Sequence, residues 1–276
     1  VTAIIAHIEK FDTIEDVQEN GATIKSGLKA GHLPVFDCAF KPALGQRSIV
    51  DMAYGKMMAA AQPFISGAIS KTVNMPSECS GADIRELESA SAEENLAYNR
   101  RLRAAVNAVA ALPMPTIAAL NGHALGGGLE LALACLMRVV STEAKLGLPE
   151  AKLGIIPATG GLARLPILVP RTFAAELALT GDLITGAEAK ELGLVNYAVE
   201  PDQVVDRALE LAAKIAKVAP LAARAICESL RRDGNLPIAD ANLRVEDRLA
   251  ALLASSDRRE GARAFLEHRE PQFEGH

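Results

Sequence analysis

The chain has 276 residues, of which 50% are hydrophobic and 23% are charged, so it can bury a sizeable core as one or two domains. Its formal net charge of -5 argues against nucleic acid as a partner, because phosphate binding needs clusters of Lys and Arg. No apolar run is long enough to cross a bilayer, and the N-terminus has no basic and apolar leader. We therefore expect no membrane partner and a cytoplasmic location.

The cysteines indicate neither a metal site nor a disulfide framework. They are scattered, with no C-x-x-C pair and no His at ligand spacing, at Cys38, Cys79, Cys135 and Cys227. We expect no bound metal, and a reducing compartment fits this pattern best.

The first eighty residues alternate helix-like and strand-like patches, with strand candidates LPVFDCAF at 33–40 and ISKTVNM at 69–75 around one helix. The Met-rich stretch between them has helical spacing and is interpreted as core filling. The run HLPVFDCAFKPALGQRSIVDMAYGKMMAAAQPFISGAISKTVNMP resembles adenosylcobalamin-dependent ribonucleotide reductases, late in their catalytic barrel, over about residues 1–79. That activity needs a radical-bearing cysteine, a carboxylate and reducing cysteines, and none is recognisable here.

From Gly81 onward the pattern is typical of α/β proteins: a helical stretch through Leu112, the strand candidate MPTIAALNG at 114–122, a Gly-rich turn and repeated strand and helix units. From Asp202 the sequence predicts successive amphipathic helices. The expected boundaries between these helices are marked by Pro220, Pro237 and the cap signal Ser255-Ser256-Asp257. We predict an atypical N-terminal segment (1–80), a catalytic core (81–201) and a helical C-terminal subdomain (202–276).

A glycine cluster separates the strand candidate from a helix-forming run. Gly126, Gly127 and Gly128 allow bare backbone to approach a ligand, and the first N–H groups of a helix can stabilise negative charge. A tight connection or a phosphate cradle would have the same pattern. The turn lacks the Lys and Ser/Thr of a Walker loop and does not match the dinucleotide fingerprint.

Two glutamates follow this turn in the sequence. Glu130, in the first turn of the helix, has apolar neighbours in sequence, and an apolar environment would make it a candidate acid or base near neutral pH. Its alternative role is to complement the helix dipole. Glu150 follows a proline in AKLGLPEAKLG and, taken alone, would be a surface turn carboxylate. Together the pair suits the addition or removal of water.

Residues 81–276 resemble the crotonase (enoyl-CoA hydratase/isomerase) family. The motifs are S-G-A-D-I at 80–84, N-G-x-A-L-G-G-G-x-E-L-A at 121–132 and G-L-P-E-x-K-L-G at 147–154. Two later stretches, LTGDLITGAEAKELGLVN and SSDRREGARAFLEHREPQF, are also similar to the family. The resemblance implies a spiral of ββα units with a helical C-terminal subdomain, assembled as homotrimers or dimers of trimers.

The resemblance also implies the roles of the site residues. The N–H groups of Ala82 and Gly127 would form an oxyanion hole for the thioester carbonyl, and Glu130 and Glu150 would add water to a 2-enoyl-CoA. Coenzyme A is then part of the acyl-CoA substrate, and no separate cofactor is expected. The remaining substrate-binding residues implied are Ser80, Gly81, Asp83, Ile84, Gly126, Gly128 and Pro149.

Some features depart from the family pattern. Leu136 replaces a common acidic residue, ATGGLARL at 158–165 differs from the usual G-G-T-Q-R-L, and residues 1–80 do not resemble the family's first strands. The alternatives are therefore another acyl-CoA reaction (isomerase, dehydratase or hydrolase), a non-catalytic hybrid chain, or an independent cobalamin-related or nucleotide-binding module at 1–80.

Two further groups of polar residues invite a functional role. We interpret His123 as a turn contact, because no nucleophile accompanies it. Arg258, Arg259 and Arg263 could contact CoA phosphates, but a solvated helix face is the preferred interpretation.

Overall fold

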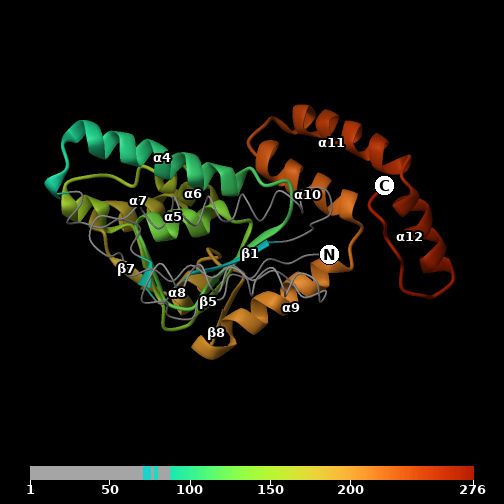
Figure 1. The fold of residues 1–276 in the computed structure, drawn as a ribbon, viewed down its shortest axis with the longest axis horizontal. Helices are drawn as coiled ribbons and strands as arrows, with labels where there is room; N and C mark the ends of the chain where they lie inside the picture. Colours follow the sequence, from blue (N-terminus) through green and yellow to red (C-terminus); the bar gives the residue numbers. More distant parts are fainter. Residues whose placement is uncertain (1–70, 76–77, 80–87) are drawn as a thin grey trace, which may run out of the picture.

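The computed structural model describes residues 71–75, 78–79 and 88–276, and it confirms the α/β class over these residues (Figure 1). The expectations for the strand at 33–40 and for the Met-rich helix lie outside the described residues. The strands are β1 (Lys71–Met75), β2 (Glu78–Cys79), β3 (Thr116–Leu120), β4 (His123–Leu125), β5 (Met137–Ser141), β6 (Lys145–Gly147), β7 (Leu183–Thr185) and β8 (Tyr197–Val199).

Most of the described chain is helical. The α-helices are α4 (Ala92–Ala110), α5 (Gly127–Ala134), α6 (Gly161–Leu168), α7 (Arg171–Thr180), α8 (Gly186–Glu191), α9 (Val204–Ala216), α10 (Pro220–Arg232), α11 (Ile238–Leu253) and α12 (Ser256–Leu266). Two short 3-10 helices are η2 (Pro149–Leu153) and η3 (Pro201–Gln203). Among the described helices, none combines the length and the apolar character needed to cross a bilayer.

The described strands form two sheets of four strands each. Their orders are β1-β3-β5-β8 and β2-β4-β6-β7. All pairs are parallel except β6 with β7. Parallel pairing requires crossover segments between strands, which the intervening helices provide.

The central strand β3 is buried on both faces, as expected for a parallel sheet covered by helices. Its side chains alternate between two hydrophobic clusters, because successive residues of a strand point to opposite faces. Ile117 and Ala119 belong to the cluster that contains α9 residues, whereas Ala118 and Leu120 belong to the larger cluster with α4 and α5 residues. Figure 1 shows α4 and α5 on one side of the strands and α9 on the other.

Helix α5 begins directly after β4 because the glycine turn allows it. Gly126 is the N-cap, with φ 54° and ψ -125°, a left-handed backbone that a side chain would strain. Its N–H donates to the carbonyl of Gly147 at 3.0 Å, which joins the turn to the end of β6. The predicted strand, turn and helix are confirmed.

The predicted C-terminal helices are also confirmed, as are their start signals. Pro220 is the first residue of α10, Pro237 is the N-cap of α11, and the Ser255 hydroxyl accepts from the Arg258 N–H at the start of α12. Helix α11 has no buried residue, although it carries several leucines. These helices extend from one end of the described molecule (Figure 1).

Candidate active site

Glu130 is buried in α5, with 2% of its surface exposed. Its Oε1 accepts from the N–H of Thr159 at 2.8 Å and of Gly161 at 2.7 Å, and its Oε2 accepts from the Thr159 hydroxyl. The expectation of an apolar environment for Glu130 is therefore wrong. Its sequence neighbours are apolar, but a segment about 30 positions later supplies three polar donors.

Glu150 lies in η2, directly after Pro149, and is half-buried. Its Oε2 is shielded from solvent and has no hydrogen-bond partner among the residues that the structure describes. Burial, with a smaller contribution from the negative charge of Glu130, raises the pKa of Glu150 to about 7. This carboxyl group can both give and take a proton near neutral pH.

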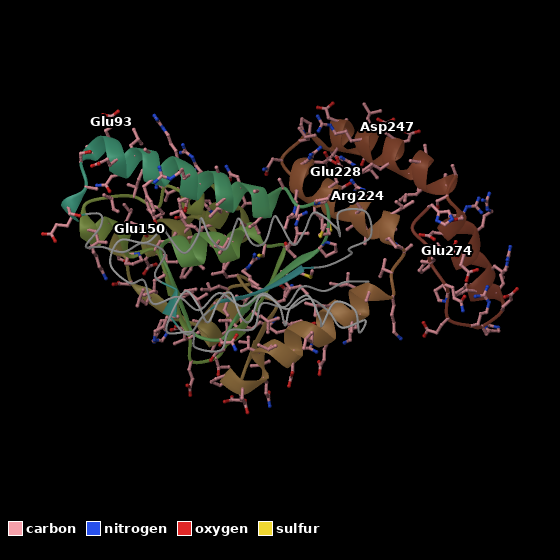
Figure 2. The ribbon with its side chains drawn as sticks, in the orientation of Figure 1. Glu93, Glu150, Arg224, Glu228, Asp247 and Glu274 are labelled. Atoms are coloured by element: carbon pink, nitrogen blue, oxygen red, sulfur yellow. The ribbon has the colours of Figure 1, made fainter. Side chains whose placement is uncertain are left out.

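The two glutamates therefore have unlike environments within one site. The Glu130 carboxylate accepts from three donors, whereas Glu150 is desolvated and its Oε2 has no partner among the described residues. Their electrostatic coupling means that they lie close enough for the charge of one to act on the other. In Figure 2, Glu150 lies at the end of the molecule opposite Glu228 and Asp247 of the C-terminal helices.

The glycine turn lies beside this pair. Gly127 is the first residue of α5, so its N–H has no acceptor within the helix and lies at the positive end of the helix dipole. Gly126 and Gly128 are buried around it, and Pro149 begins η2. The structure thus gathers the predicted residues of the second and third motifs, and the N–H of Gly127 is a candidate donor to an oxyanion.

Residues of the first motif, Ser80, Gly81, Ala82, Asp83 and Ile84, lie outside the described residues. The strand that precedes them, β2, pairs in parallel with β4, with Cys79 opposite Ala124. The C-terminal end of β2 therefore lies beside the strand that leads into the glycine turn.

The other polar candidates have contacts in line with their structural interpretations. His123 is exposed, and its Nδ1 accepts from the N–H of Lys145 at 3.0 Å. Arg258, Arg259 and Arg263 are exposed on α12. Among the described cysteines, Cys135 and Cys227 are both buried and free.

Sequence reasoning missed the residues that hold Glu130. Thr159 and Gly161 contact the Glu130 carboxylate. Burial lowers the pKa of Arg164, and the negative charge of Glu130 opposes this effect. These residues belong to the stretch ATGGLARL, which differs from the family pattern. That departure was a signal, but it did not indicate contact with Glu130.

This geometry suits a reaction in which a carbonyl gains negative charge while a proton moves at a neighbouring carbon. The N-terminus of α5 provides the electrostatic stabilisation, and Glu150 has a pKa suited to proton exchange. One open lone pair of Glu130 remains for a water molecule, because its other acceptor sites are used.

Comparisons with known proteins agree with this geometry. The family model described as enoyl-CoA hydratase/isomerase matches residues 77–276, and a second model, the ribonucleotide reductase barrel domain, matches residues 4–96. The mitochondrial enoyl-CoA hydratase domain-containing protein 2 of Mus musculus is 43% identical over 201 residues, covering 71% of this chain and 68% of that protein.

A second relative and a solved structure are also similar to this chain. Mitochondrial methylglutaconyl-CoA hydratase of Homo sapiens is 39% identical over 201 residues, which is 71% of this chain and 59% of that protein. The crystal structure of an enoyl-CoA hydratase from Bacillus anthracis superimposes with a TM-score of 0.78 at 33% identity. It covers 82% of this chain and 89% of that one, so the expected crotonase-like fold is confirmed. The chain belongs to the enoyl-CoA hydratase/isomerase family.

Proposed function

We propose that this chain is an enoyl-CoA hydratase, which adds water across the double bond of a 2-enoyl-CoA thioester. The observation that carries the proposal is the pair of glutamates in unlike environments beside a helix N-terminus. Glu130 is buried and held by three donors. The Oε2 of Glu150 has no partner among the described residues, and burial raises the pKa of Glu150 to about 7. Hydration needs one group that orients and deprotonates water and another that supplies a proton.

In the proposed reaction, a water molecule lies between the two carboxyl groups. Glu130 accepts a proton from this water through Oε2 as the water oxygen forms a bond to the β carbon. The electrons of the double bond move toward the thioester carbonyl, whose developing charge is stabilised by the N–H groups of Gly127 and Ala82. Protonated Glu150 then gives its proton to the α carbon. A proton passes afterwards from Glu130 to Glu150 through solvent and restores the starting state.

The proposal extends to the partners of the chain. Coenzyme A is part of the substrate, no separate cofactor takes part, and the chain assembles as a homotrimer or dimer of trimers. Support for assembly comes from large apolar side chains that are more than half exposed on α10, α11 and α12. These are Ile226, Leu230, Ile238, Leu243, Leu253, Phe265 and Leu266. We propose a cytoplasmic location.

The test is hydration of crotonyl-CoA, followed as loss of enoyl-thioester absorbance, by the parent chain and by Glu130→Gln and Glu150→Gln. Each variant is expected to lose at least about a hundredfold in kcat, because general acid–base catalysis contributes roughly 100- to 10,000-fold. Glu176→Gln is the matched control, since Glu176 is exposed on α7. 3-Methylglutaconyl-CoA is a suitable second substrate, because a relative is named for its hydration.

The outcomes separate the alternatives. Loss in both variants supports hydration by two glutamates. Loss in Glu150→Gln alone would contradict the two-glutamate mechanism and favour an isomerase or another acyl-CoA reaction. A folded parent that fails to bind CoA would point to a non-catalytic hybrid chain.

A further inference from the structure

The carboxylate of Glu130 is held by a single short segment of the chain, residues 157–161. Two of its three donors are backbone N–H groups, and the third is the Thr159 side chain. Thr159 is 1% exposed, so its hydroxyl has no ready access to bulk solvent. Nothing in the proposed reaction so far uses this hydroxyl.

The segment is built so that it approaches Glu130 closely. Gly160 has φ 124°, a conformation that favours glycine, and a Cβ at Gly161 would lie 3.1 Å from Glu130 Oε1 and 3.0 Å from Pro157 Cβ. The Arg164 side chain donates to the carbonyl of Thr159 at 3.3 Å and to Asn107 Oδ1 at 2.7 Å. The backbone of Thr159 is thus held at its N–H by Glu130 and at its carbonyl by Arg164.

We propose that Thr159 is a positioning residue that orients Glu130 for its reaction with water. The two N–H donors occupy Oε1, and the Thr159 hydroxyl occupies one acceptor site of Oε2, so a single direction remains open to the water molecule. This inference rests on the proposed hydratase function.

The hydroxyl has a property that the two N–H donors lack. A backbone N–H can only donate, whereas a threonine hydroxyl rotates and can either donate or accept. It can donate to Oε2 while Glu130 is ionised. Once Glu130 has taken the proton of the water, the hydroxyl can accept that proton's hydrogen bond after the proton has turned about the carboxyl C–O bond. Thr159 therefore remains a partner of Glu130 in both protonation states.

Two other ionisable groups of the described residues act on Glu130. Glu150 in η2 is a like charge when ionised, and Arg164 in α6 is an opposite charge. Neither is hydrogen-bonded to the Glu130 carboxylate among the bonds of the described residues. Replacing Thr159 therefore changes a direct contact while it leaves both charges in place.

The first test compares Thr159→Val with Thr159→Ser in crotonyl-CoA hydration over a range of pH. Thr159→Val removes the hydroxyl, and kcat is expected to fall about tenfold or more with less than a twofold change in KM, because a hydrogen bond to a charged group is lost. The pH–rate profile should change as well, because the Glu130 carboxylate has lost a donor. Thr159→Ser keeps the hydroxyl and should restore both properties.

Thr116→Val is the matched control. Thr116 is fully buried like Thr159, but its hydroxyl accepts from the Leu136 N–H at 2.9 Å and from Arg231 at 3.2 Å and has no bond to Glu130. Its replacement should lower stability but leave the pH–rate profile unchanged. Should Thr159→Val fail to fold, the smaller Thr159→Ala tests the same loss.

A second readout does not depend on turnover. In protein labelled with 13C at the glutamate side-chain carboxyl carbon, the Glu130 signal is assigned by its absence from Glu130→Gln. The chemical shift of this signal should differ between Thr159→Val and the parent, because the carboxylate loses the Thr159 hydroxyl as a donor. A parent that does not hydrate crotonyl-CoA would overturn the proposed function, whereas the labelled carboxyl would still report on Thr159.

Three results would overturn the role of Thr159: an unchanged kcat and pH–rate profile in Thr159→Val, a loss in Thr159→Ser as large as in Thr159→Val, or an unchanged Glu130 carboxyl signal in Thr159→Val.

Discussion

Glu150 shows how a carboxyl group becomes a proton donor near neutral pH. A carboxylate loses hydration when it is buried, and its neutral form is then favoured unless donors compensate. The Oε2 of Glu150 is shielded and has no partner in the part of the chain that the structure describes, and burial raises its pKa to about 7. The cost of ionising Glu150 should therefore be visible in the stability of the folded chain.

We expect the free energy of unfolding to fall as the pH rises from about 4.5 to about 7, through the contribution of Glu150. In this window the folded state holds more protons than the unfolded state, because the pKa of Glu150 is raised from 4.5 to about 7 on folding. Glu150 does not lower the free energy of unfolding below about pH 4.5, and it lowers it by the full amount above about pH 7. Because the group is only half-buried, we expect roughly 1–2 kcal/mol.

Urea unfolding of the parent and of Glu150→Gln at pH 5, 6, 7 and 8 measures this contribution. The variant should gain stability relative to the parent between pH 5 and 7, since glutamine does not ionise. Glu176→Gln, at an exposed position, should follow the parent. Parallel curves for the parent and Glu150→Gln would mean that ionised Glu150 is adequately solvated.

At the residue scale, the sequence indicated Glu130 and Glu150 as candidates but did not predict how each carboxyl group is held. Glu130 and Glu150 stand in local motifs that can be recognised without a structure. The partner of Glu130, Thr159, lies 29 positions away. The two residues meet only in the folded chain. The neighbours of Glu130 in sequence are apolar, so the sequence did not predict its polar contacts.

At the scale of the element, helix α5 must be fixed because it carries both Gly127 and Glu130. Its C-terminal end is capped by Arg138, which is 4% exposed. The Arg138 guanidinium donates to Cys135 O at 2.7 Å, to Ala132 O at 3.3 Å and to Leu194 O at 2.7 Å. The bonds to Ala132 and Cys135 hold carbonyls at the C-terminal end of α5. The bond to Leu194 joins this end to the segment after α8.

Arg138→Met should lower the free energy of unfolding by about 2 kcal/mol, because three buried carbonyls lose a donor while the cost of burying a charge is relieved. Among the described residues no carboxylate pairs with Arg138, so no buried charge is left behind. Hydration should slow as well, since α5 loses its anchor. Urea unfolding and kcat measure the two effects.

Two further variants frame this prediction. Arg138→Lys keeps a charge but lacks the planar fork of donors, so its loss should be intermediate. Arg171→Met changes an exposed arginine at the start of α7 and should have little effect. Wild-type stability in Arg138→Met would show that the α5 carbonyls need no arginine.

Elements were predictable where local chemistry defines them. The strand at 116–120, the glycine turn before α5 and the Ser255 cap follow from apolar runs, backbone freedom and capping. The pairing of strands was not predictable, because neighbours such as β5 and β8 are joined through helices. The role of Arg138 at the end of α5 was not predicted either. Its partners are backbone carbonyls, which every residue has, so no sequence pattern indicates them.

At the scale of the whole molecule, the change of sequence character near residue 80 agrees with the comparisons. One family model matches residues 4–96 and the other residues 77–276. In the described part of this junction, β1 pairs with β3 along its whole length, so residues 71–75 belong to the hydratase-type sheet. The two family resemblances indicated the change near residue 80, because the sequence motifs of each family are specific. The amino-acid composition does not change enough there to indicate it.

The C-terminal helices expose more apolar surface than an isolated domain would keep in water. Phe265 is 81% and Leu266 is 78% exposed on α12, at the end of the molecule away from Glu150 (Figure 2). We propose that another copy of the chain covers them, and we expect sedimentation velocity to show a trimer or a multiple of it. Burying such side chains stabilises an interface by about 1.5–3 kcal/mol each.

The double variant Phe265→Glu and Leu266→Glu should therefore weaken assembly by more than about a hundredfold, because two apolar side chains are lost and two charges would be buried without partners. The expected result is a monomer at micromolar concentration. Leu179→Glu is the control, since Leu179 is 78% exposed on α7, outside these helices. A monomeric parent, or a double variant that sediments like the parent, would show that α12 does not form the interface. A monomer that still hydrated crotonyl-CoA would further show that each chain contains a complete site, in agreement with two glutamates that come from one chain.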